Sequence, residues 1–208
     1  MPDLPALFLK GGPIMWPLLV CSLVALTVAL ERLFFILAEK SRRAPAVVDS
    51  MLDAVERNAP EAALERGKTS RDFVARTLCS ALAHRREKSI SSALLRAAER
   101  ELARYDRGLS TLDTIITLAP LLGLLGTVTG MMRSFNMIGG TELGAPTAIT
   151  GGIAEALIAT AFGLAIAITA LIPFNYLNAR LEQARREIQD AAAHLEIHLE
   201  HASRPPQP

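Results

Sequence analysis

Three long apolar runs interrupt an otherwise charged chain, and their lengths predict three membrane-spanning helices. The first run begins at residue 14, and its leading 17 positions are uncharged. The second run is the 19 uncharged residues 114–132, and the third covers the 31 positions 149–179 with one charged side chain, Glu155. Because a hydrocarbon core of ~30 Å needs about 20 helical residues, each run is long enough to cross a bilayer.

These spans predict an all-α membrane protein whose helices continue into long aqueous extensions. Half of the 208 residues are hydrophobic while 21% are charged, which fits a membrane protein with a substantial aqueous part. The predicted segments are an interfacial N-terminal segment (1–13), transmembrane helix 1 (14–38), a helical region (39–111), transmembrane helix 2 (112–134), an outer loop (135–147), transmembrane helix 3 (148–179) and a helical tail with a disordered end (180–208).

The distribution of lysine and arginine predicts the orientation. Residues 39–111 hold 15 of the 22 Lys and Arg residues, whereas the loop between the second and third spans holds only Arg133. Since positively charged loops stay on the cytoplasmic side, we expect the N-terminus outside and both 39–111 and the C-terminus inside. The first span lacks a convincing cleavage site, so it is interpreted as an uncleaved anchor.

The region 39–111 reads as helical throughout, with breaks expected at Pro60 and Gly67. From Ser89 the apolar spacing continues into the second span, which predicts a single helix as far as Met132. Beyond the third span an apolar stripe recurs at helical spacing. It consists of Leu181, Ala184, Ile188, Ala191 and Leu195. This stripe predicts packing either against the 89–111 helix of the same chain or against another subunit.

Small residues concentrate on the second and third spans, which predicts close helix contacts in lipid. The candidates for helix packing are Gly123, Gly126, Gly130, Ala156, Ala159, Gly163 and Ala167. Two arrangements remain open: packing inside one three-helix protomer, or several protomers around a crowded central axis.

Thr127, Glu155 and Thr160 are the candidate pore-lining or proton-path residues. Counted from the inner ends of their spans, the two hydroxyls reach similar depths, with Glu155 near the outer edge. Glu155 and Thr160 are five residues apart, roughly 140° around a helix, so both cannot point into one channel. The plainer interpretations are a threonine bonded to its own helix and an interfacial Glu155 paired with Arg133 or a backbone donor.

Other polar groups receive structural interpretations. Glu31 and Arg32 form an inner-face charge pair, in which Arg32 can snorkel to the headgroups and Glu31 can pair with a neighbouring helix. The spacing of His194, His198 and His201 could hold a metal, but without a fixed acidic or cysteine complement we favour a solvated face. We therefore predict no metal site, no cofactor and no enzymatic activity, and the net charge of +1 gives no case for nucleic-acid binding.

The segments LGLLGTVTG (122–130) and GGIAEALIATAFG (151–163) resemble the paired signatures of the ExbB/TolQ/MotA proton-channel family. The likeness is greatest to the ExbB branch, with TolQ second, and covers essentially the whole chain. The MotA branch fits less well, because its members are typically longer with four spans. Two departures are Thr129, where many relatives have Trp, and a lead into the third span without the usual Ala-Pro-Gly turn.

The resemblance implies a homopentamer in the bacterial inner membrane whose second and third spans line a pore. Two copies of an ExbD-like single-span partner would sit in that pore and carry the proton-binding Asp. A TonB-like effector would then drive outer-membrane uptake of iron complexes and vitamins. By motif match, Thr127, Glu155 and Thr160 correspond to the family's functional polar residues. Alternatives are a TolQ-like role in envelope maintenance, a non-conducting scaffold, and a channel that needs no partner.

Overall fold

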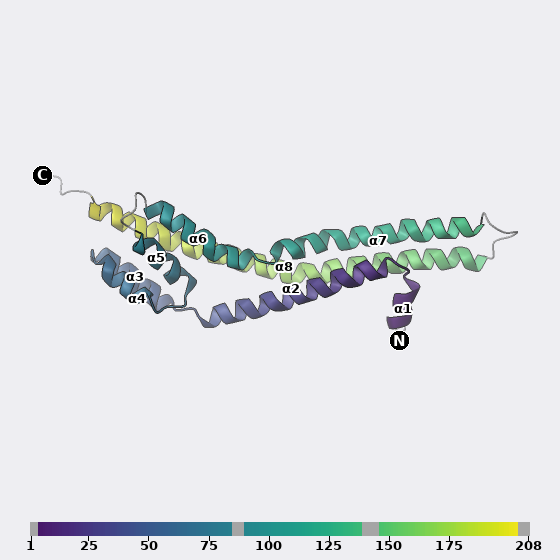
Figure 1. The fold of residues 1–208 in the computed structure, drawn as a ribbon, viewed down its shortest axis with the longest axis horizontal. Helices are drawn as coiled ribbons and strands as arrows, with labels where there is room; N and C mark the ends of the chain where they lie inside the picture. The colour runs from purple at the N-terminus through teal and green to yellow at the C-terminus, as the bar shows by residue number, and fades with distance from the viewer. Residues whose placement is uncertain (1–3, 85–89, 139–145, 204–208) are drawn as a thin grey trace. The chain divides into compact units, whose positions relative to one another are not determined.

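The computed structural model describes residues 4–84, 90–138 and 146–203, and within these residues every regular element is an α-helix (Figure 1). The predicted all-α class is therefore confirmed. The helices are α1 (Leu4–Lys10), α2 (Met15–Ser41), α3 (Pro45–Glu56), α4 (Pro60–Gly67), α5 (Phe73–Ala83), α6 (Ile90–Asp106), α7 (Leu109–Ile138) and α8 (Pro146–Ser203).

The chain forms two compact units. Residues 1–33 and 108–176 form the first, here called the membrane unit, and residues 34–107 and 177–208 form the second, here called the charged unit. Three helices among the described residues, α2, α7 and α8, are long and apolar enough to cross a membrane. Their outward side chains include large exposed apolar groups such as Phe135 and Ile172, as expected for a lipid-facing or subunit-facing surface.

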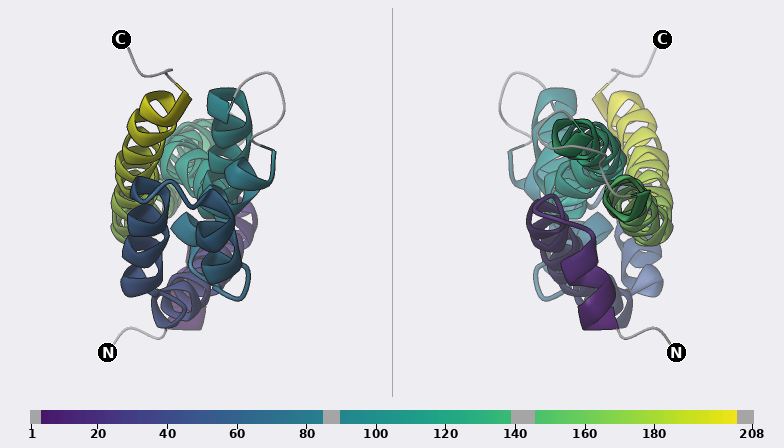
Figure 2. Two further views of the ribbon diagram at one scale, coloured as in Figure 1. Left: turned by 90° about the vertical axis from the view of Figure 1, so that its left-hand side faces the viewer. Right: turned by 90° about the vertical axis from the view of Figure 1, so that its right-hand side faces the viewer.

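Within the membrane unit α7 and α8 lie side by side (Figures 1 and 2). Their contacts join positions far apart in sequence, such as Gly123 with Thr160 and Gly130 with Ala156. The first membrane helix, α2, also faces α8, and the two helices line a shared apolar groove. All three spans therefore belong to one packed bundle.

The expected single helix from Ser89 to Met132 is wrong, because α6 ends at Asp106 and α7 begins at Leu109. Ser89 itself lies outside the described residues. Gly108, between the two helices, has a φ of +81°. That left-handed conformation costs glycine little and other residues more, and it ends a helix.

In the charged unit, Pro60 opens α4 and Gly67 ends it, so both lie at helix boundaries as predicted. Proline is well suited to the first turn of a helix because it needs no N–H donor there. The stripe of Leu181, Ile188 and Leu195 on α8 is buried within the single chain. Contact inside the chain therefore accounts for this stripe, which is one of the two arrangements that its pattern allowed.

Asp72 connects several parts of the charged unit although its side chain is fully buried. Its Oδ1 accepts a hydrogen bond from the Val74 backbone N–H at 2.8 Å, which caps the N-terminus of α5. Its Oδ2 accepts from the backbone N–H of Ala44 at 2.9 Å, and Arg43 forms an ion pair with the same carboxylate at 3.4 Å. One carboxylate thus ties the start of α5 to the segment before α3.

A second polar network, formed by Arg76, Glu101 and Glu39, lies beside Tyr105 on α6. The Arg76 guanidinium pairs with Glu101 at 2.6 Å and with the buried Glu39 at 3.3 Å. Burial, and to a lesser extent the Glu39 carboxylate, raises the pKa of the Tyr105 phenol above its ordinary value. The phenol therefore stays protonated at neutral pH, and its ring packs edge-on against Phe35 and Phe73.

Candidate functional site in the membrane unit

The small residues of the second and third spans bring the backbones of α7 and α8 into direct contact, and this contact is here called the α7–α8 seam. A Cβ atom built on Gly123 would lie 3.0 Å from the Cα of Thr160, and one built on Gly163 would lie 2.5 Å from the carbonyl oxygen of Ala119. Real Cβ atoms need more space than this, so glycine permits the approach. The predicted packing residues that are buried or in seam contact are Gly123, Gly126, Gly130, Ala156, Ala159, Gly163 and Ala167.

Thr160 crosses the seam. Its hydroxyl donates a hydrogen bond to the backbone carbonyl oxygen of Gly123 at 3.0 Å. Within one protomer this hydroxyl is therefore engaged between helices and only partly buried. A hydrogen bond of this kind in a membrane bundle contributes about 0.6–1.7 kcal/mol.

Thr127 lies one helical turn beyond Gly123 on α7 and makes a different bond. Its hydroxyl donates to the carbonyl oxygen of Leu124 on the same helix, at 2.6 Å. Thr127 and Thr160 thus lie at neighbouring positions along the seam, but the structure does not bring their hydroxyls together through a hydrogen bond. Both side chains keep partial exposure in the single chain.

Glu155 lies on α8 opposite Arg133 of α7. Its Oε1 accepts from Nη1 of Arg133 at 2.9 Å, with the carboxylate side chain 19% exposed and the arginine 50% exposed. The pair is consistent with the plainer interpretation of Glu155 given above. It also holds the carboxylate at a fixed place, one and a half helical turns from Thr160.

The turn at Gly12 also approaches the Glu155 carboxylate, and the sequence did not predict this contact. Gly12, in the turn between α1 and α2, has a φ of +74°, and a Cβ atom built on it would collide with the Glu155 carboxylate. Gly11-Gly12-Pro13 is a turn signal in the sequence, but nothing in it indicates which distant side chain the turn approaches. Ser134 was also missed; it is buried and donates to the Gly130 carbonyl at 3.2 Å.

The predicted charge pair of Glu31 and Arg32 is present, with the two side chains in direct ion-pair contact. Snorkelling of Arg32 to the headgroups is wrong for this chain, because the residue is only 5% exposed. Its aliphatic stem packs beside Gly108, where the absence of a side chain leaves room for it. Glu31 is the exposed member of the pair and contacts Arg32 rather than a neighbouring helix.

Three spans, a glycine-lined seam and a single ion-paired carboxylate on the third span define the chain as a multipass, all-α membrane protein. Residues 65–190 match the model of the MotA/TolQ/ExbB proton channel family. This match covers more than half of the chain and includes both halves of the α7–α8 seam. The chain therefore belongs to the MotA/TolQ/ExbB proton channel family.

Individual relatives place the chain nearest to the ExbB members. It is 40% identical over 176 residues to the biopolymer transport protein ExbB-like 1 of Synechocystis sp., covering 82% of this chain and 68% of the relative. It is 34% identical over 194 residues to ExbB-like 3 of the same organism, covering 91% of each. The biopolymer transport protein ExbB of Pseudomonas putida is 30% identical over 187 residues, covering 86% of this chain and 57% of the relative.

Proposed function

We propose that several copies of this chain, five by the family resemblance, form a ring in the bacterial inner membrane. Its N-terminus would be periplasmic and its C-terminus cytoplasmic. An ExbD-like partner would sit in the ring and carry protons on its own Asp, and a TonB-like effector would receive the work. In this proposal the chain is not an enzyme. Each charge that crosses the membrane gains about 2.3 kcal/mol per 100 mV, which is an adequate energy source.

The observation that carries the proposal is the fixed position of Glu155 in an apolar span. Glu155 is the only charged side chain in residues 149–179 and is held by Arg133 at 2.9 Å. A carboxylate in or at the edge of the hydrocarbon core is costly and usually faces protein or water. One carboxylate in the third span of each chain suits a ring that shapes the electrostatics of a proton path while a partner chain carries the proton. Thr127 and Thr160 would offer hydroxyls along that path.

The test is growth on an iron source that requires a TonB-like system, in cells that depend on this chain and its partner. We expect Glu155→Ala to abolish growth while the purified complex keeps its subunit number. Glu182→Gln serves as the matched control, because Glu182 is an exposed carboxylate farther along α8. Wild-type growth of the Glu155→Ala strain would overturn the proposed role of this residue.

A non-conducting scaffold is the second candidate, and the hydrogen bonds of the two threonines favour it. The hydroxyls of Thr160 and Thr127 both donate to backbone carbonyl oxygens rather than to groups along a proton path. A scaffold predicts that Thr160→Val weakens the oligomer and leaves the coupled activity per assembled complex unchanged. The proposed proton-driven ring predicts loss of that activity. Two measurements distinguish an ExbB-like role from a TolQ-like one. Loss of an ExbB-like protein should impair growth under iron limitation, whereas loss of a TolQ-like protein should make the cells sensitive to detergents.

A further inference from the structure

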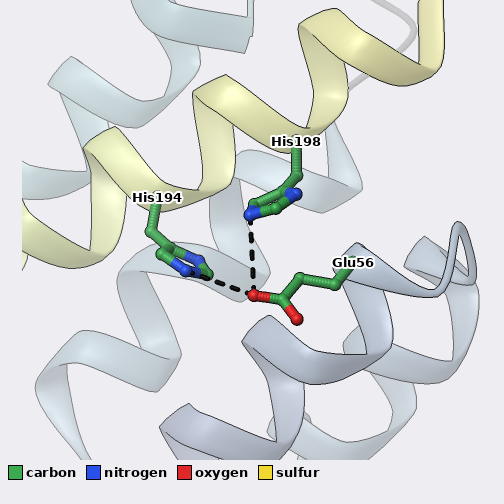
Figure 3. Close-up of side chains that lie close together, drawn as sticks. All are labelled: Glu56, His194 and His198. Atoms are coloured by element: carbon green, nitrogen blue, oxygen red, sulfur yellow. Dashed lines mark ion pairs between the residues drawn. The ribbon is translucent and has the colours of Figure 1, made fainter.

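Two histidines of α8 and one glutamate of α3 converge within the charged unit, and these three residues are here called the His–Glu cluster (Figure 3). The Nε2 atom of His194 lies 3.3 Å from Oε1 of Glu56, and the Nε2 atom of His198 lies 3.5 Å from the same oxygen. All three ligand atoms lie within 4.8 Å of one another. Glu56 is the acidic complement that the sequence pattern alone did not reveal.

We propose that the His–Glu cluster is a zinc site that fastens α8 to α3. Two histidine nitrogens and one carboxylate oxygen form a ligand set that zinc uses, with the fourth tetrahedral position left to water. Histidines four residues apart on a helix point to the same side, one turn apart. Neither the proposed function nor the family match assigns a metal to this part of the chain.

The distances within the His–Glu cluster are compatible with those between the ligands of one zinc ion. Charge-assisted hydrogen bonds between histidine and carboxylate are short, about 2.7–2.9 Å. Zinc bonds of about 2.0–2.1 Å in tetrahedral geometry instead place neighbouring ligand atoms about 3.3–3.4 Å apart. The two nitrogen–oxygen separations of 3.3 and 3.5 Å lie close to that spacing, and all three ligand atoms lie within 4.8 Å of one another.

The surroundings of His194 also favour a cation. Asp49 and Asp190 line a pocket with His194. Arg43 lines the same pocket, but its charge is matched by Asp72 and Glu187. A divalent cation would therefore enter an anionic environment.

The side chains of the His–Glu cluster are exposed enough for zinc to bind them in the folded protein. The three side chains are between 35% and 43% exposed, so zinc can reach them in the folded protein, and their replacement leaves the buried stripe of α8 intact. Glu56 is the last residue of α3, while His194 and His198 lie on the final turns of α8. A bound ion would therefore crosslink two segments that are distant in sequence and would raise the stability of the folded unit.

The first experiment titrates the metal-free, full-length protein in detergent with zinc chloride against a chromophoric chelator. We expect one zinc per chain. Loss of an outer-shell partner typically costs about 10–100-fold in metal affinity, and Glu56→Gln, His194→Gln and His198→Gln should each lose more because each removes a direct ligand. His84→Gln is the matched control, because His84 lies at the exposed end of α5 and bonds to the backbone of Ser80. Wild-type protein that binds less than one zinc in the micromolar range would overturn the proposal.

A second measurement identifies the ligands without relying on a variant. Cobalt(II) bound to the wild-type protein should give the visible absorption of a tetrahedral ion and no thiolate charge-transfer band. A thiolate band would assign the metal to Cys21 or Cys79, both free cysteines, and would overturn the proposal. If the histidine variants lose the same amount of Tm relative to wild type with and without zinc, the cluster is held by ordinary His–Glu hydrogen bonds. That result would also overturn the proposal.

Discussion

Glu155 of α8 and Arg133 of α7 form an ion pair across the α7–α8 seam, with 2.9 Å between Oε1 and Nη1. The carboxylate is the more enclosed partner, at 19% exposed against 50% for the arginine. The ion pair gives Glu155 two possible roles, charge pairing and tuning of a proton path, which the sequence alone could not distinguish. Pairing alone depends on opposite charges, whereas tuning a proton path depends on a carboxylate at this one position.

Exchanging the two charges tests these roles. In Arg133→Glu with Glu155→Arg, we expect the pair to re-form and the oligomer to recover the stability that either single reversal loses, up to about 1 kcal/mol for a partly exposed pair. Proton-dependent uptake should stay lost, because the carboxylate has moved from α8 to α7. Thermal unfolding in detergent and growth on a TonB-dependent iron source measure the two effects separately. Full recovery of growth would mean that pairing is the whole function of Glu155.

Gly12→Ala should impair the same function from a different helix. A Cβ atom at this position collides with the Glu155 carboxylate, and the backbone φ of +74° is one that alanine adopts at a cost of about 1–2 kcal/mol. We expect uptake to fall while the complex still assembles. Gly151→Ala is the control, because a Cβ atom there meets nothing within 4 Å. Equal uptake by both variants would show that the Gly12 contact has no functional weight.

Thr160→Val should weaken the bundle more than Thr169→Val. The Thr160 hydroxyl bonds across the seam to the Gly123 carbonyl at 3.0 Å, whereas Thr169 bonds to Ala165 of its own helix at 2.7 Å and is exposed. We expect a loss of about 0.6–1.7 kcal/mol for Thr160→Val and little change for Thr169→Val. Thr160→Ser, which keeps the hydroxyl, should restore most of the stability. Chemical unfolding in detergent provides the measurement.

Gly163→Ala should destabilise the seam through backbone contact. Its Cβ atom would lie 2.5 Å from the Ala119 carbonyl oxygen, and neither helix can yield there by rotating a side chain. Overpacking of this kind costs about 1–3 kcal/mol. Gly151→Ala, on the same helix with open space around it, should be neutral or slightly stabilising. A ranking in the opposite order would mean that α7 and α8 pack differently in the assembled protein.

The features that recur along the chain could be predicted from the sequence. The three spans follow from the length of the apolar runs, and the seam follows from Gly123, Gly126 and Gly130 at close spacing. The boundaries at Pro60 and Gly67 follow from residue chemistry. Each of these signals is local, so no knowledge of distant contacts is needed to interpret it.

Relationships that depend on distant residues could not be predicted. Glu56 lies far in sequence from His194 and His198, and no pattern on α3 indicates that α8 passes beside it. The break at Gly108 was missed for a different reason, because a single glycine within a helical pattern can be tolerated and does not by itself end the helix. Asp72 before Phe73-Val74 did carry a readable signal, since aspartate is a preferred N-cap ahead of an apolar run.

Asp72 should be the most sensitive polar position in the charged unit. Asp72→Ala removes the acceptor for the backbone N–H groups of Val74 and Ala44 and leaves Arg43 without one of its partners. Loss of the cap and two unsatisfied donors should cost about 2–4 kcal/mol. Asp72→Asn, which keeps an acceptor oxygen, should cost less. Glu65→Ala is the exposed control, with an expected change within about 0.5 kcal/mol. Hydrogen exchange should show faster exchange of the first amides of α5 in Asp72→Ala alone, and unchanged protection there would contradict the assigned cap.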